Sequence, residues 1–242
     1  MKALLITLSG VFLGFVGCIN ATSWEAKDFS DIKGTQESKS ILIIGANGSV
    51  AKVATQGFLS GTNAKLKLFL RDSKRLAKVA EQNPNRITLI EGNAFDKDSL
   101  KSAMSGADVV YANLTGDLPA MASAIIQAMK EAGLKRLVWV GSFGVYEGEI
   151  PKSEEDRIRA YLPPHREAVR IIEASGLDYT IIRAQWFSSA NEIDYELTRK
   201  GEAFKNPSAY ISRKSIAHLV IKLCMERNFG VKESLGINKP SR

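Results

Sequence analysis

The sequence predicts an α/β fold, a single domain built on a doubly wound parallel sheet. Short apolar segments alternate with stretches of helical spacing, an order typical of parallel strands joined by crossover helices. The segments are apolar at consecutive positions, as in strands that are covered on both faces. A length of 242 residues suits one such domain, and a content of 45% hydrophobic and 24% charged residues excludes wholesale disorder.

Six segments are predicted to be strands, and each ends where a turn or a polar stretch begins. In chain order they are residues 41–44, 66–70, 87–90, 109–111, 137–140 and 179–182. The stretches between them have helical spacing, as at Met121, Ile125 and Met129, and Gly133 is a typical helix stop. The alternation therefore runs through most of the chain after Ser40.

A glycine-containing turn directly follows the first predicted strand and opens a helix, with the sequence Gly45-Ala-Asn-Gly48-Ser-Val-Ala51. Gly45 suits a tight turn, Gly48 lets the backbone approach a diphosphate, and Ala51 lets the helix pack near the strand. The free N–H groups at the start of the helix attract phosphate. This placement is the one that the dinucleotide-binding fingerprint requires, so we expect a Rossmann-like nucleotide site, with a merely structural turn as the alternative.

Further cofactor contacts are expected at the carboxyl ends of the other strands, where open α/β sheets bind ligands. Arg71 stands where an acidic residue would hold the ribose hydroxyls of NAD, and its guanidinium suits a 2′-phosphate. NADP is therefore expected, while the neighbouring Asp72 keeps NAD open as an alternative. The predicted cofactor-binding residues are Gly45, Asn47, Gly48, Ser49, Val50, Arg71, Asn93, Ala94, Ala112, Asn113 and Ser142.

These residues resemble a known family. The glycine turn, the strand ending at Arg71, Gly141-Ser142 and the segments 175–183 and 211–219 are similar to those of the atypical short-chain dehydrogenase/reductases with an NmrA-like NAD(P)-binding domain. The resemblance runs from about Ser40 to the end of the chain, and it is strongest to the branch of flavin reductase/biliverdin-IXβ reductase. It implies the fold, the use of NADP and an oxidoreductase activity.

The resemblance also implies catalytic residues, although the sequence departs from the family pattern. Extended short-chain dehydrogenases use a serine after the fifth strand and a Tyr-x-x-x-Lys pair. Ser142 matches the serine, whereas the lysine position holds His165, with Tyr161 four residues before it. Pro163 and Pro164 suit the first turn of a helix, so we expect the helix to begin near Pro164 and Tyr161 to lie in the preceding loop. The flavin reductase branch combines a serine with a histidine at these two places, which this sequence retains.

The expected reaction is hydride transfer from NAD(P)H to a flavin-like, quinone-like or related conjugated acceptor. Ser142 would orient the nicotinamide amide or the acceptor carbonyl, and His165 would donate a proton or fix the polar edge of the acceptor. Trp186, Phe187 and the loop 143–162 are candidates for covering a planar substrate. Each of these residues has a structural alternative as a strand-end hydroxyl, a helix-start polar residue or a packing residue.

Two other functions stay open at this stage. One is a non-catalytic NAD(P)-binding sensor or regulatory protein of the NmrA-like type, because the Tyr-Lys pair is missing. The other is an epimerase or dehydratase acting on a nucleotide sugar, which the short segment after Arg183 disfavours because it leaves little chain for a sugar-binding lobe. His218, the second histidine of the chain, is expected to be a packing residue.

The first 18 residues are predicted to be a secretory signal, since Lys2 precedes a short apolar run from Ala3 to Val16. The following Gly17-Cys18 resembles part of a bacterial lipoprotein cleavage box, in which case Cys18 would carry lipid and anchor the protein to a membrane. Residues 19–39 are expected to form a polar tether before the domain at 40–242. The expected localisation is exported or membrane-anchored, with a cytoplasmic enzyme as the alternative.

Charge and cysteine content limit the partners. The 33 lysines and arginines exceed the 26 acidic residues without forming a long basic run, so we do not expect a nucleic-acid partner. The expected partner is a small-molecule acceptor. Cys18 and Cys224 lie far apart and outside any Cys/His cluster, so we expect neither a metal site nor a disulfide framework.

Overall fold

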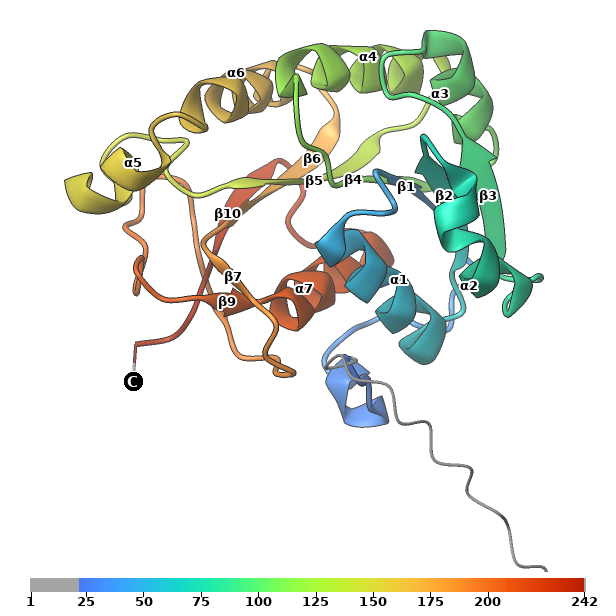
Figure 1. Ribbon diagram of the computed structural model, residues 1–242, viewed down its shortest axis with the longest axis horizontal. Helices are drawn as coiled ribbons and strands as arrows, with labels where there is room; N and C mark the ends of the chain where they lie inside the picture. Colours follow the sequence, from blue (N-terminus) through green and yellow to red (C-terminus); the bar gives the residue numbers. More distant parts are fainter. Residues whose placement is uncertain (1–21, 242) are drawn as a thin grey trace, which may run out of the picture.

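The computed structural model describes residues 22–241, and the predicted leader with Cys18 lies outside the described residues. Eight strands form the central sheet in the order β3-β2-β1-β4-β5-β6-β10-β8 (Figure 1). All neighbours are parallel except β8, which pairs with β10 in the antiparallel sense. The strand bounds are β1 Ser40–Ile44, β2 Lys65–Leu70, β3 Ile87–Glu91, β4 Val109–Ala112, β5 Arg136–Ser142, β6 Asp178–Ala184, β8 Glu196–Thr198 and β10 Glu233–Asn238. The predicted doubly wound α/β fold is confirmed.

Helices cover both faces of this sheet (Figure 1). The helices α1 (Ser49–Gly61), α2 (Ala77–Glu81) and α7 (Arg213–Met225) lie on one face. On the other face lie α3 (Lys97–Met104), α4 (Leu118–Glu131) and α6 (Leu162–Glu173), with the short α5 (Lys152–Ile158) beyond the start of α6. Within residues 22–241, no helix combines the length and the hydropathy needed to cross a bilayer.

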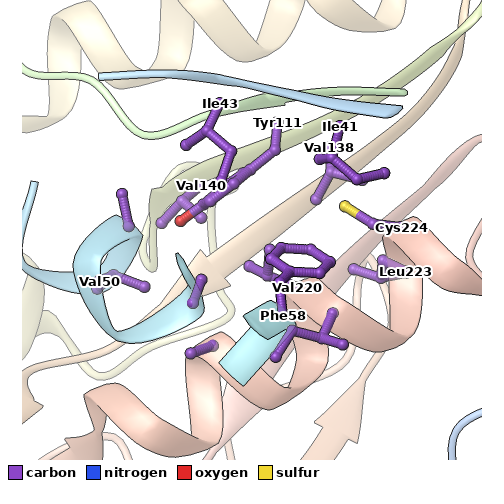
Figure 2. Close-up of a cluster of buried hydrophobic side chains, with 14 of the residues drawn as sticks. Ile41, Ile43, Val50, Phe58, Tyr111, Val138, Val140, Val220, Leu223 and Cys224 are labelled. Carbon is purple, nitrogen blue, oxygen red and sulfur yellow. The ribbon is translucent and has the colours of Figure 1, made fainter. Parts of the chain in front are cut away.

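The core explains why the strands are apolar at consecutive positions. On β1, Ile41 and Ile43 pack toward α1 and α7, whereas Leu42 and Ile44 pack toward α3 and α4, and all four side chains are fully buried. Figure 2 shows the first of these clusters, in which Phe58 of α1 meets the sheet side chains. A strand buried on both faces can have no polar alternation, which is the pattern from which the fold was predicted.

The order of the strands positions the functional site. The chain passes from β1 outward to β2 and β3, then returns to place β4 on the other side of β1. The connections therefore change direction between β1 and β4. In open α/β sheets a crevice forms at this point, outside the carboxyl ends of the strands.

Residues 22–39, which we name the strap, pack onto the domain where the composition predicts a tether. Phe29, at the end of the 3-10 helix η1 (Ala26–Phe29), is only 8% exposed, and its ring stacks on Trp24 with centroids 5.2 Å apart. A Cβ at Gly57 of α1 would lie 2.7 Å from the Trp24 ring, and one at Gly61 would collide with the Phe29 ring. Asp28 is held to Lys214 of α7 at 2.8 Å. The strap is thus part of the packed fold.

A second, two-stranded sheet lies near the carboxyl end of β6. It consists of β7 (Phe187–Ser188) and β9 (Ile211–Ser212), which pair in parallel. Ile211 is fully buried, and its N–H donates to the carbonyl of Trp186 at 2.7 Å. The pairing fixes the backbone that follows the sixth strand, where the sequence places Trp186 and Phe187.

Candidate nucleotide and acceptor site

A cavity of about 1110 Å³ extends along the carboxyl ends of the strands from β3 to β6. The predicted site residues that line it are Gly45, Asn47, Gly48, Ser49, Val50, Arg71, Asn93, Ala94, Asn113, Ser142, Tyr161 and His165. Ala112 is the exception, because this last residue of β4 is fully buried in the core against α3 and α4 and does not line the cavity. The strand-end positions are brought together as the sheet topology requires.

The turn after β1 forms a backbone cradle. Gly45 has a φ of +81°, and its carbonyl accepts a hydrogen bond from the N–H of Gly48 at 2.9 Å. A Cβ at Gly45 would collide with the carbonyl oxygen of Asn113, and a Cβ at Gly48 would collide with the Asn113 side-chain amide. The positive φ and the backbone oxygen require glycine at Gly45, whereas a side chain at Gly48 would have to displace the Asn113 amide, and the two glycines keep the backbone open to a ligand.

The cradle leads into the amino terminus of α1, which no side chain caps. The first turn of this helix also carries no acidic residue. Its unpaired N–H groups and the positive end of its dipole therefore remain available to an anion. Together with the glycine turn, these groups make a site suited to a diphosphate.

One end of the cavity carries charged side chains. Arg71, directly after β2, is exposed and lines the cavity together with Asp72 and Arg75. The Asp72 carboxylate accepts a bond from Arg75 Nε at 3.1 Å. Because one arginine balances Asp72, the remaining charge of Arg71 gives this end an excess of positive charge, which suits a phosphate better than a ribose hydroxyl.

The other end, which we name the acceptor half, has a different character. It is lined by Val140, Gly141, Ser142, Phe143, Ile158, Tyr161, His165, Ala184, Gln185, Trp186 and Phe187. Among these described lining residues there is no aspartate, glutamate, lysine or arginine. Four aromatic rings and a histidine make this half a surface for a planar ring system.

The three predicted catalytic residues all lie in the acceptor half. Ser142 ends β5, and its hydroxyl donates to the Phe143 carbonyl at 3.0 Å. Helix α6 begins at Leu162, two residues before the predicted start, so both prolines occupy its first turn. Tyr161 immediately precedes this helix and is 68% exposed, so it lies at the mouth of the cavity.

His165 lies in the first part of α6 with its Nδ1 buried and without a hydrogen-bond partner in the described chain. Burial lowers the pKa of His165 below its ordinary value of 6.5, so the ring is neutral at neutral pH. A neutral imidazole that lines the cavity is better suited to bind the polar edge of a substrate than to donate a proton. Of the two predicted roles, the neutral ring favours fixing the polar edge of the acceptor over donating a proton.

Both histidines make the folded protein sensitive to acid. Burial lowers the pKa of His165 and of His218, so the unfolded chain takes up protons near pH 6.5 while the folded chain still excludes them. The free energy of unfolding is therefore expected to fall as the pH drops from about 7 to about 5. We expect H165N to show a smaller fall than the unsubstituted protein in urea denaturation across this range. An unchanged pH slope in H165N would contradict the assignment.

Several lining residues escaped the sequence analysis. Arg75 and Asp117 reach the cavity, and so does Phe95, which is 50% exposed. Phe95 follows Asn93 in the turn after β3, so its position at a strand end was a usable signal. Glu154 was also missed, although its carboxylate accepts a bond from Trp186 Nε1 at 3.1 Å, because nothing in the local sequence marks a glutamate on α5 as buried.

Comparisons with known proteins agree with this geometry. A family described as NAD(P)H-binding matches residues 45–227. A Rossmann-fold NAD(P)-binding family protein from Shigella flexneri is 37% identical, with a TM-score of 0.72 over 85% of this chain and 95% of that one. A short-chain dehydrogenase/reductase from Veillonella parvula, whose structure is a complex with NADP, is 26% identical, with a TM-score of 0.76 over 84% of this chain and 95% of that one.

Among curated proteins, eugenol synthase 1 of Petunia hybrida is 27% identical over an alignment of 163 residues, and the match covers 63% of this chain and 50% of the plant enzyme. The chain thus spans about half the length of the plant relatives that it matches.

Proposed function

Since this chain belongs to the NAD(P)H-binding family and has the architecture of an atypical short-chain dehydrogenase/reductase, we propose that it is an NADPH-dependent reductase of a flavin-like, quinone-like or related conjugated acceptor. One observation carries the proposal. The cavity joins a glycine cradle and a positively charged end to an uncharged, aromatic acceptor half. A hydride donor and a planar acceptor can therefore share one cavity.

The residues present fit the cofactor. Gly45 and Gly48 place no side chain over the turn and so keep the amino terminus of α1 open for the diphosphate. Arg71 would hold the 2′-phosphate, and Asn93, which lines the same cavity, would bind the adenine. The bound cofactor would supply the hydride, and the acceptor would gain this hydride together with one proton.

The protein's own groups then have three tasks. The aromatic side chains of the acceptor half bind the acceptor ring and exclude water from it. The Ser142 hydroxyl lies at the end of β5, where it can hydrogen-bond an acceptor carbonyl once it turns from the Phe143 backbone. The neutral ring of His165 belongs to the lining of this half, where it would bind the polar edge of the acceptor. Because a conjugated acceptor can take its proton from water, the absence of a Tyr-Lys pair is compatible with reduction.

The cofactor preference can be tested at Arg71. We expect R71Q to raise the dissociation constant of NADPH by about 10- to 100-fold, because a charge-assisted contact to phosphate is worth about 1.5 to 3 kcal/mol. The constant for NADH, which lacks the 2′-phosphate, should change little. Isothermal titration with both cofactors measures the difference. Equal weakening of NADPH and NADH would show that Arg71 does not read the 2′-phosphate.

The activity can be tested by NADPH oxidation with a panel of flavins and quinones. We expect turnover, and we expect S142A and H165A each to lower kcat by about 10- to 100-fold while cofactor binding is retained. Tight cofactor binding without turnover of any acceptor would instead favour a non-catalytic sensor. Full activity of both variants would remove these residues from the mechanism.

A further inference from the structure

A buried carboxylate lies directly behind the acceptor half. The side chain of Glu154, on α5, is only 6% exposed. Its oxygens accept bonds from Trp186 Nε1 at 3.1 Å, from Ser208 Oγ at 2.9 Å and from Arg157 Nη1 at 3.0 Å. Buried charges are costly unless they are paired and hydrogen-bonded, and Glu154 meets both conditions. Glu154 is not among the residues that line the cavity.

These bonds fix the indole of Trp186. Besides the bond from its N–H to Glu154, the indole ring meets the ring of Phe143 at 74° with centroids 5.9 Å apart. The guanidinium of Arg157 lies 4.9 Å from the indole centroid. Trp186 also lines the cavity, so an indole that is held by three neighbours forms part of the acceptor wall. Such an immobilised ring is a ready platform on which a planar molecule can stack.

The same carboxylate sets the charge of this wall. Although burial would raise it, the pKa of Glu154 is held below its ordinary value by the bonds from Trp186, Ser208 and Arg157. Glu154 is therefore ionised at neutral pH and balances Arg157, its partner one turn along α5. Without Glu154, the half-exposed guanidinium over the indole would be an unbalanced positive charge, added to that of Arg213, which lies 5.7 Å from the Phe187 centroid on the same wall.

We propose that Glu154 is a positioning and specificity-determining residue, which fixes Trp186 as the stacking platform and cancels the charge of Arg157, so that the site takes uncharged ring acceptors in preference to anionic ones. This inference rests on the proposed function and names the class of acceptor. Glu154 acts through Trp186 and Arg157 and does not itself touch the substrate.

Riboflavin and flavin mononucleotide test the proposal, because they share one ring system and differ by a phosphate. Stacking on an indole quenches flavin fluorescence, so binding to the protein loaded with NADP can be measured without turnover. We expect the unsubstituted protein to bind riboflavin about tenfold more tightly than flavin mononucleotide, and E154Q to lose or reverse this preference. Adding R157Q to E154Q should restore it. Equal affinities in the unsubstituted protein, or an unchanged ratio in E154Q, would overturn the proposal.

Two further variants serve as controls. E155Q removes a neighbouring carboxylate of the same helix, which pairs with Arg166, and should leave the affinity ratio unchanged. W186L should abolish most of the quenching while the dissociation constant of NADPH stays the same, and this holds even if E154Q fails to fold. Retained quenching in W186L would overturn the platform role. The two claims can fail separately. If the flavins bind as expected but no acceptor supports NADPH oxidation, the role of Glu154 stands and the proposed reductase activity is wrong.

Discussion

Replacing Glu149 by glutamine is expected to lower the free energy of unfolding by about 3 to 5 kcal/mol. Arg183 and Glu149 form an ion pair whose side chains are 0% and 1% exposed. Arg183 also donates to the carbonyl oxygens of Thr198 and Ser234, and Glu149 accepts from the N–H of Gly201 at 2.8 Å. In E149Q the guanidinium would stay buried without a balancing charge, and that cost exceeds the value of most single contacts.

Urea denaturation measures this loss, and a surface pair provides the matched control. E233Q breaks the pair of Glu233 with Arg199, whose side chain is 73% exposed, and should cost less than about 1 kcal/mol. The double variant E149Q/R183M should recover part of the loss, because it removes both buried charges. A cost for E149Q within the range of the surface control would show that the pair is not a major support of the fold.

The location of this pair gives it a second effect. Glu149 lies in the loop that follows β5, and Arg183 lies in β6, three residues before Trp186. Their contact ties the loop to the strand on the side of the acceptor half. In E149Q, acceptor binding should therefore weaken at temperatures where the fold is still intact.

Replacing Gly45 by alanine is expected to weaken NADPH binding by about 100-fold or more. Its φ of +81° is strained for an L-residue, and the added Cβ would collide with the carbonyl oxygen of Asn113. Relief of the clash must move the turn after β1, which displaces the N–H groups that would hold the diphosphate. The effect on binding should thus exceed the effect on stability.

Gly133 offers a control that separates strain from collision. It also has a positive φ, of +71°, but a Cβ there would meet nothing within 4 Å. G133A should cost about 1 kcal/mol of stability and leave the dissociation constant of NADPH unchanged. Isothermal titration of both variants, with circular dichroism to verify the fold, makes the comparison. An unchanged constant in G45A would remove the glycine turn from cofactor binding.

The sequence predicted the part of the fold that depends on local pattern. The six segments expected as strands are β1 to β6, because strands buried on both faces need consecutive apolar residues. The strand β10 was missed, since Ser234, Gly236 and Asn238 interrupt its apolar residues. Gly236 is required by tertiary packing, because a Cβ there would lie 2.9 Å from the ring of Phe204. Such a requirement is invisible in a short segment.

In the candidate site, too, the residues marked by local sequence were predicted and those fixed by tertiary contacts were not. Residues at or just beyond the end of a strand, such as Ser142 and Asn93, were predicted because the sheet brings all strand ends to one edge. The partners of Trp186 were not, since Glu154 precedes it by 32 residues and reaches it only through the path of the loop and α5. The pairing of Arg183 with Glu149, 34 residues apart, is hidden for the same reason.

The strap also bears on how the molecule is made. Its contacts join distant parts of the chain, as where the N–H of Lys33 donates to Glu226 across 193 residues. Ribosomes deliver proteins from the amino end, so Trp24 and Phe29 emerge long before α7. The strap can therefore pack against α7 only when translation is nearly complete. Until then α7 does not cover the apolar face of β1.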